Sequence, residues 1–236
     1  MIQPQMFART AAVLALAATA AQAETVNVTN DLLQSPKTAA YMYSRPMMEN
    51  MYRLGVAQDR KFGLQPECKT QYQVKPVSIS VLAPIDFPDD KPHPTKGAWN
   101  SRYQFERCGE SKVYNAIHLA ADNGQPPAVR PFYPGTSNAN LVLIKDALPA
   151  ALMGAMIRSG LKDCKEIDVF DMKVSAPPHD VSEGGKTLKG VWTEDWTFRL
   201  CGQLVEVPMI FTPNPATGGT NFSTAPFTMN ENKAKP

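Results

Sequence analysis

Apolar and polar residues alternate along the stretch from Trp192 to Cys201. Alternation of this kind predicts a β-strand with one buried face, because successive side chains of a strand point to opposite sides of the sheet. The predicted buried face carries Trp192, Glu194, Trp196, Phe198 and Leu200. Residues 99–105 place aromatic side chains at the same positions relative to their own tryptophan. Both stretches are therefore predicted to be strands that pack on a core.

These two strands belong to a longer internal repeat. Residues 96–109 read KGAWNSRYQFERCG and residues 189–202 read KGVWTEDWTFRLCG, and six of the fourteen positions are identical. A proline lies fifteen residues before the tryptophan in both copies, at Pro84 and Pro177. The agreement of residue types and spacing predicts a tandem duplication of one structural unit, since two copies are too few for a solenoid.

Each unit is predicted to begin with a helix. In the first unit, Pro46 suits the first turn of the helix, Gly63 suits its end, and apolar residues recur between them at helical spacing. In the second unit, Asp146 is the predicted N-cap and Gly160 the predicted end.

Extended segments follow each helix. Residues 69–82 and 165–174 alternate with one slip in phase, which indicates a β-bulge. Residues 112–119 and 204–211 predict the strand after each aromatic strand, and residues 140–144 (NLVLI) predict a fourth strand for the first unit. Long hairpin loops are expected to follow the two shared prolines.

The predicted fold class is α+β, a tandem duplication of a unit with one helix and a three- to four-stranded antiparallel sheet, each unit braced by one disulfide. The predicted organisation is a signal peptide at 1–23, an N-terminal segment at 24–45, a first repeat at 46–146, a second repeat at 147–228 and a disordered tail at 229–236.

The sequence contains four cysteines: Cys68, Cys108, Cys164 and Cys201. In each unit one cysteine precedes the first strand and the other ends the second strand, and these two ends lie side by side in an antiparallel hairpin. A disulfide requires Cα atoms about 5.5 Å apart, so this geometry predicts the pairs Cys68–Cys108 and Cys164–Cys201. No C-x-x-C pair is present, which argues against a thioredoxin-like redox motif and against a four-cysteine zinc site.

The N-terminal residues 1–23 combine one positive charge, a short run of small apolar residues and an Ala-Gln-Ala site, which is the pattern of a cleavable signal peptide. We expect cleavage after Ala23 and a periplasmic or secreted protein of the bacterial cell envelope. The remaining chain has 23 basic and 22 acidic residues. This balance argues against a nucleic-acid partner, and no later apolar run is long enough for a membrane span.

Loop residues of both units offer metal ligands. His93 lies near Asp89 and Asp90, and His179 is followed by Asp180. Histidine and carboxylate groups can bind a divalent metal or transfer protons. This pattern leaves open a metal-assisted hydrolase.

Methionines in the first predicted helix leave open a second kind of metal site, one that binds copper. Met47, Met48 and Met51 carry soft thioether groups that can bind Cu(I), as expected of a periplasmic copper-binding protein. Their helical spacing equally suits ordinary core packing. His118 lies in a predicted strand and is interpreted as a structural histidine.

The preferred interpretation is a non-enzymatic, exported binding or interaction protein whose partner is a protein or a small molecule. No G-x-S-x-G elbow and no glycine-rich phosphate loop occur, so no catalytic residue and no cofactor are predicted. The two units share a framework but differ in their loops, and recognition residues commonly lie in loops. Residues 125–135 (QPPAVRPFYPG) have no counterpart in the second unit and are predicted to contact the partner.

Overall fold

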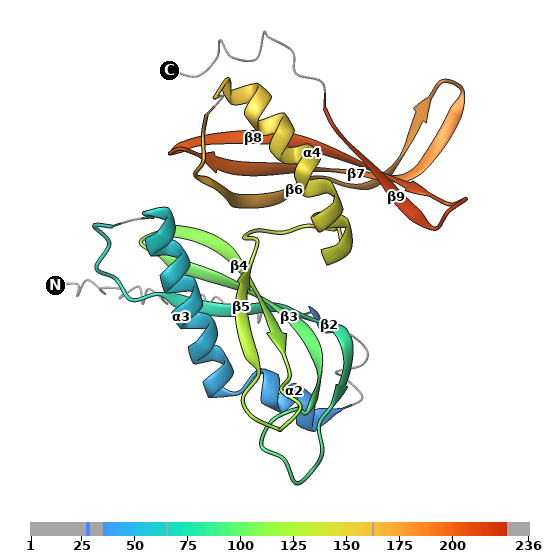
Figure 1. The fold of residues 1–236 in the computed structure, drawn as a ribbon. Helices are drawn as coiled ribbons and strands as arrows, with labels where there is room; N and C mark the ends of the chain where they lie inside the picture. The colour runs from blue at the N-terminus through green and yellow to red at the C-terminus, as the bar shows by residue number, and fades with distance from the viewer. Residues whose placement is uncertain (1–26, 29–34, 65, 162, 226–236) are drawn as a thin grey trace, which may run out of the picture.

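The computed structural model describes residues 27–28, 35–64, 66–161 and 163–225. The predicted signal peptide and the predicted tail at 229–236 lie outside these residues. The described chain forms two sheets, with strand orders β1-β2-β3-β4-β5 and β6-β7-β8-β9. Figure 1 shows that helix α3 accompanies the first sheet and helix α4 the second. The predicted α+β fold with two sheet units is therefore confirmed.

The first unit consists of β1 (Asn27–Val28), α2 (Pro36–Met42), α3 (Arg45–Phe62), β2 (Gln73–Asp86), β3 (Lys96–Arg107), β4 (Glu110–Leu119) and β5 (Ala128–Phe132). The second consists of α4 (Leu141–Ser159), β6 (Ile167–Glu183), β7 (Lys186–Leu200), β8 (Gln203–Asn214) and β9 (Gly219–Thr224). Neighbouring strands are antiparallel throughout except β1 and β2, which pair in parallel.

Helix α3 has the limits that the sequence predicted. Proline lies in its first turn, and Gly63 ends it with a φ of 63°, a left-handed conformation that glycine adopts without strain. Its buried side lies on the aromatic face of the first sheet. The approach is close at Gly55, where an added Cβ would lie 2.4 Å from the ring of Phe105.

Helix α4 begins earlier than predicted. Asn140 is the N-cap, because its side chain accepts a hydrogen bond from the backbone N–H of Leu143. The predicted N-cap Asp146 is therefore wrong and lies inside the helix, and the predicted strand at 140–144 is instead its first turn. Ile144 belongs to the buried stripe that continues along the helix through Ala147, Ala151 and Ala155.

The last strand of the first sheet, β5, lies where a loop was predicted. β5 falls within residues 125–135 and pairs with β4 along one edge of the sheet. Pro131 is tolerated there because an edge strand need not donate every backbone hydrogen bond. β5 and β9 thus hold corresponding edge positions, each beside the strand that follows the aromatic strand of its unit.

The two hairpins after the shared prolines differ. In the first unit, residues 87–95 form a loop between β2 and β3. In the second unit, β6 and β7 remain paired as far as Glu183 and Lys186, and the predicted loop is wrong. Gly184 and Gly185 make the two-residue turn with φ values of 57° and 77°, as a type I′ turn requires. The paired ends of β6 and β7, with this turn, project beyond the rest of the second sheet (Figure 1).

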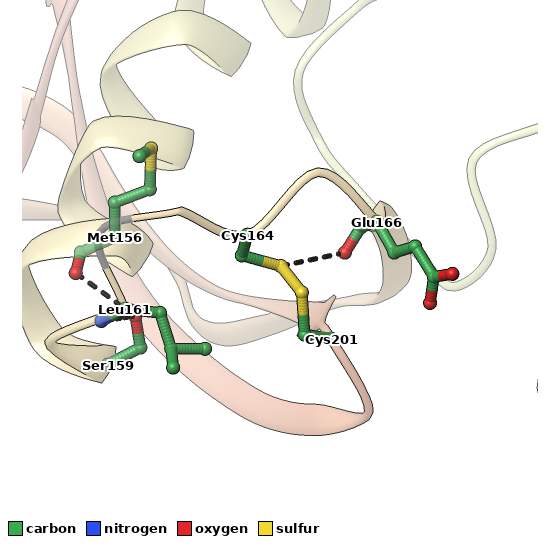
Figure 2. Close-up of a disulfide and its surroundings, with 6 residues drawn as sticks. All are labelled: Met156, Ser159, Leu161, Cys164, Glu166 and Cys201. Carbon is green, nitrogen blue, oxygen red and sulfur yellow. Dashed lines mark hydrogen bonds between the residues drawn. A yellow bond between two sulfur atoms is a disulfide. The ribbon is translucent and has the colours of Figure 1, made fainter.

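Both predicted disulfides are present. Cys68 joins Cys108, and Cys164 joins Cys201. The second cysteine of each pair has a positive φ, 50° for Cys108 and 46° for Cys201, in the turn that follows the aromatic strand. Figure 2 shows the second disulfide beyond the end of α4, with the Cys164 sulfur 3.2 Å from the carbonyl oxygen of Glu166. The same carbonyl accepts a hydrogen bond from the Cys201 N–H at 3.0 Å.

The aromatic strands form the two cores in corresponding ways. In the first unit Trp99 stacks on His118 with ring centroids 4.9 Å apart and planes 7° from parallel. In the second unit Trp192 stacks on Phe211 at 5.0 Å and 9°. Each tryptophan is the cross-strand partner of the ring that it covers. The core of each unit therefore lies between its aromatic strand and its own helix.

Candidate functional site

The two units meet along the linker at 133–140, which connects β5 to α4 and bonds to both sheets (Figure 1). The Gly135 N–H donates to the carbonyl of Val113 on β4 at 2.8 Å. Met172 on β6 donates to Pro134 at 3.0 Å and accepts from Thr136 at 2.6 Å. The linker is therefore held against one strand of each unit.

Gly135 is required for this arrangement. Its φ is 94°, and an added Cβ would lie 2.0 Å from the carbonyl oxygen of Met172. A side chain is excluded by both the backbone conformation and the contact, so the close approach of the linker to β6 depends on glycine.

A buried carboxylate holds the next part of the linker. Glu194 lies in β7 on the face covered by α4 and is fully buried. Its two oxygens accept from five groups: Trp192 Nε1 (2.9 Å), Trp196 Nε1 (2.8 Å), Ser137 Oγ (2.7 Å), Asn138 N (2.8 Å) and Ala139 N (3.4 Å). Buried charges occur where hydrogen bonds satisfy them. Glu194 therefore fixes the linker to the core of the second unit.

Direct contacts between the units surround the linker. Phe62 at the end of α3 packs edge-on against Phe170 of β6 with ring centroids 5.1 Å apart. Asp168 accepts from the side chains of Lys61 and Arg199, one from each unit. Burial opposes the ionisation of Asp168, but these hydrogen bonds and charges outweigh it and lower its pKa. The junction is thus fixed by apolar, ionic and backbone contacts.

A cavity of about 450 Å³ opens at this junction, and we call it the junction cavity. Both units line it, and the side chains that give it its character are Asp59, Tyr72, Arg107, Lys112, Phe170 and Asp171. Its volume falls within the range of small-molecule sites, about 300–1,000 Å³. It combines flat aromatic walls with charges of both signs.

Asp59 of α3 supplies one of the carboxylates that line the cavity. Asp59 is buried in the apolar stripe of α3 and accepts a hydrogen bond from the Tyr114 hydroxyl. Burial and then the bond to Asp59 raise the pKa of Tyr114, and the same causes raise the pKa of Tyr72 to about 12. Both phenols therefore remain protonated donors at neutral pH.

Two cations lie over aromatic rings in the same cavity. The Arg107 guanidinium lies 4.0 Å from the centre of the Tyr72 ring. The Lys112 ammonium lies 3.9 Å from the centre of the Phe170 ring and 3.8 Å from a carboxylate oxygen of Asp171. Burial lowers the pKa of Lys112. Cation–π contacts of this kind hold a charge in place, and Arg107 also donates from Nη2 to the carbonyl of Leu64 at 3.2 Å.

The histidines predicted as metal ligands lie apart and have other contacts. His93 Nδ1 is 2.9 Å from the Tyr41 hydroxyl in the first unit. His179 lies in β6, not in a loop, and its Nδ1 is 2.8 Å from the carbonyl of Pro177. The neighbouring Asp180 accepts from the Gly190 N–H.

The remaining predicted ligands are likewise engaged elsewhere. Asp89 pairs with Lys37 and Asp90 with Lys91, at exposed positions. Met47 packs around Trp99, whereas Met51 packs in the next cluster with Met48 against it. In the part of the chain that the structure describes, no group of three or more His, Cys, Asp or Glu residues is placed to hold a metal ion.

Apart from Gly135, which ends the segment 125–135 predicted to contact the partner, the residues of the junction cavity were not among the predicted candidates. One of them left a signal in the sequence, because Asp59 lies at helical spacing from Met51, Gly55 and Phe62 on the buried stripe of α3. A charged residue on an apolar stripe is typical of a satisfied buried group. The sequence offers no comparable signal for Lys112 or Arg107.

No known protein family, curated protein or solved structure matches the chain. Within the described residues, no helix is both long enough and apolar enough to cross a membrane. The two disulfides are consistent with an extracellular or periplasmic protein.

Proposed function

We propose that this chain is an exported, non-enzymatic binding protein that holds its ligand in the junction cavity. The observation that carries the proposal is the cavity itself, which both units line and in which three cations (Arg107, Lys112 and Lys173) and three carboxylates (Asp59, Glu110 and Asp171) lie beside aromatic walls. Ligand sites commonly lie where two structural units meet and combine apolar walls with a few fixed polar groups.

The charges of the cavity indicate the class of ligand. Arg107 and Lys112 suit a carboxylate, and Asp59 and Asp171 suit an ammonium group. The rings of Tyr72 and Phe170, which also line the cavity, suit a flat or apolar side chain. A small molecule that carries both charges, such as a free amino acid, satisfies all three.

We also propose that the two units arose by tandem duplication. The disulfides, the positive φ of the second cysteine in each pair and the matched tryptophan stacks support this proposal. On this proposal the cavity lies between two copies of one scaffold.

The two alternative functions have no comparable support. A metal-assisted hydrolase would use His93 with Asp89 and Asp90, or His179 with Asp180. A copper-binding protein would use Met47, Met48 and Met51. Elemental analysis of the purified chain separates them, because stoichiometric zinc would favour the first and copper the second.

The binding function is tested with a panel of free amino acids. We expect at least one aromatic or long-chain amino acid to raise the melting temperature of the protein and to give a saturable isotherm in titration calorimetry. In Lys112→Met the affinity should fall at least tenfold, since one charge-assisted contact is lost. Lys145→Met is the matched control, because Lys145 is exposed on α4 and does not line the cavity.

Two results would contradict the proposal. One is an amino-acid affinity that is the same in Lys112→Met and in the wild type. The other is metal-dependent hydrolysis of ester or phosphate substrates that disappears in His93→Ala or His179→Ala, which would establish the enzymatic alternative.

A further inference from the structure

A second, smaller cavity lies on the open face of the first sheet, opposite the face that α3 covers. Its volume is about 240 Å³, and the linker and the first turn of α4 close it. We call it the arginine cavity. Polar groups from three strands line its floor: Ser78, Ser80, Asn100, Arg102 and Asn115.

Arg102 is oriented by a chain of hydrogen bonds. Its Nε donates to Asn115 Oδ1 at 3.0 Å. The Nδ2 group of Asn115 donates to the carbonyls of Tyr133 and Gly135 at 2.7 Å and 2.9 Å. Asn115 is buried, so this link fixes both the guanidinium and the linker.

The outer nitrogens of the guanidinium remain available to a ligand. Among the described residues, the only hydrogen-bond acceptor found for Arg102 is Asn115, which engages Nε. Burial lowers the pKa of Arg102, and the charge of Glu194 opposes that effect. An anion binds more strongly to a partly desolvated cation with unused donors than to a fully hydrated cation, because the lower local dielectric strengthens the electrostatic attraction.

Among the described residues, Arg102 is the one charged side chain that lines this cavity. Within that same part of the chain the lining contains no Asp and no Glu, in contrast to the junction cavity. Asn100 also has unused capacity, because its buried side-chain oxygen has no hydrogen-bond partner within the described residues. The amide can turn so that its NH₂ group donates to an anion beside Arg102. The polar side of the cavity is therefore complementary to a negative charge.

Much of the remaining lining is apolar. Leu82, Phe132, Leu141, Ile144 and Met172 supply this apolar surface, and they come from both units. An anion without a carbon chain would leave this surface without a partner. A molecule that ends in a carboxylate and continues into a short hydrocarbon chain matches both parts of the lining.

We propose that the arginine cavity binds a small organic carboxylate, with the carboxylate on Arg102 and the hydrocarbon chain between Phe132 and the first turn of α4. The planar guanidinium can donate two parallel hydrogen bonds to one carboxylate. The proposal goes beyond the amino-acid binding proposed for the junction cavity, since the two cavities have different charged residues.

The probes are butyrate and hexanoate, with butylamine and inorganic phosphate as the contrasting molecules. We expect both carboxylates to bind in titration calorimetry, hexanoate the more tightly, and both contrasting molecules to give no isotherm. In NMR spectra of the ¹⁵N-labelled protein, hexanoate should shift the Arg102 Nε–H resonance and the Leu141 amide.

The variants are Arg102→Met, which removes the charge, and Arg102→Lys, which keeps the charge and loses the paired geometry. We expect at least a tenfold loss of hexanoate affinity in the first variant and a smaller loss in the second. Arg130→Met is the matched control and should bind as the wild type does, because Arg130 is exposed on β5 and does not line the cavity. If Arg102→Met does not fold, Arg102→Lys and the NMR shifts decide.

The proposal is overturned if hexanoate does not bind, if it binds Arg102→Met as well as the wild type, or if phosphate binds in its place. Lys112→Met should leave hexanoate binding unchanged. Failure of amino-acid binding at the junction cavity therefore does not affect this test.

Discussion

Replacing Glu194 by glutamine should destabilise the protein although it changes the volume of the side chain very little. Three of the five donors reach Oε1 and two reach Oε2. A glutamine that keeps its oxygen at the Oε1 position places its NH₂ group at the Oε2 position, where it faces Ser137 and Trp196. The serine hydroxyl can rotate and accept, but the indole N–H of Trp196 has no other role than donor.

The expected cost follows from these contacts. A buried donor left without a partner costs about 1–3 kcal/mol. The remaining bonds also weaken, because hydrogen bonds to a charged acceptor are stronger than those to a neutral one. The amide in turn escapes the desolvation cost of a buried charge. We expect a net loss of about 2–3 kcal/mol for Glu194→Gln and about 4–5 kcal/mol for Glu194→Ala, which removes the shared acceptor of all five donors. Within the described residues, only the Ala139 N–H keeps another acceptor, Ser137 Oγ at 3.0 Å.

Urea unfolding followed by tryptophan fluorescence measures this loss, since two of the donors are indoles. Glu206→Gln is the matched control, because Glu206 is exposed on β8 of the same sheet, and it should change the stability by less than about 0.5 kcal/mol. Glu194→Gln can be as stable as the wild type only if the hydrogen bonds to the carboxylate stabilise the fold by no more than its desolvation costs. In that case the anchoring role assigned to Glu194 is wrong.

The other predictions concern three further positions. Gly135→Ala should lower the melting temperature by several degrees in a calorimetric scan, because the added methyl group meets a backbone oxygen 2.0 Å away. Burial lowers the pKa of His118 from 6.5 to about 4, so stability should fall between those pH values as the unfolded chain takes up the proton, by up to about 3 kcal/mol. His118→Phe, which imitates Phe211, should remove that acid sensitivity in urea titrations. Cys164→Ala with Cys201→Ala should cost about 4 kcal/mol, as closure of a loop with sequence separation 37 implies.

Features that depend on local pattern could be predicted from the sequence. The aromatic strands, the limits of α3 and both disulfides follow from alternation, from proline and glycine at helix ends and from cysteine spacing. The start of α4 could not be predicted in this way. Its outer side carries the exposed apolar residues Val142, Met153 and Ile157, so the helix has no clear polar face. Its hydrophobic periodicity therefore does not indicate the residue at which the helix begins.

The candidate sites depend on how the units meet, and sequence patterns contain little information on that point. Arg102 looks like an ordinary polar position on the solvent face of a strand, and only the linker and α4 enclose it. Lys112 likewise becomes a cavity residue because Phe170 and Asp171 of the other unit lie against it. Two histidines and the methionines of α3 were predicted as metal ligands because of their side-chain chemistry, whereas the structure places them at separate positions.

The order of the cysteines along the chain affects oxidative folding. Each disulfide joins a cysteine to the next one in sequence, with separations of 40 and 37 residues. A chain that enters an oxidising compartment N-terminus first exposes Cys68 and Cys108 before either partner of the second pair. An oxidase that couples cysteines in order of emergence therefore produces the native connectivity directly. Three pairings are possible for four cysteines, and this one requires no later reshuffling by a disulfide isomerase.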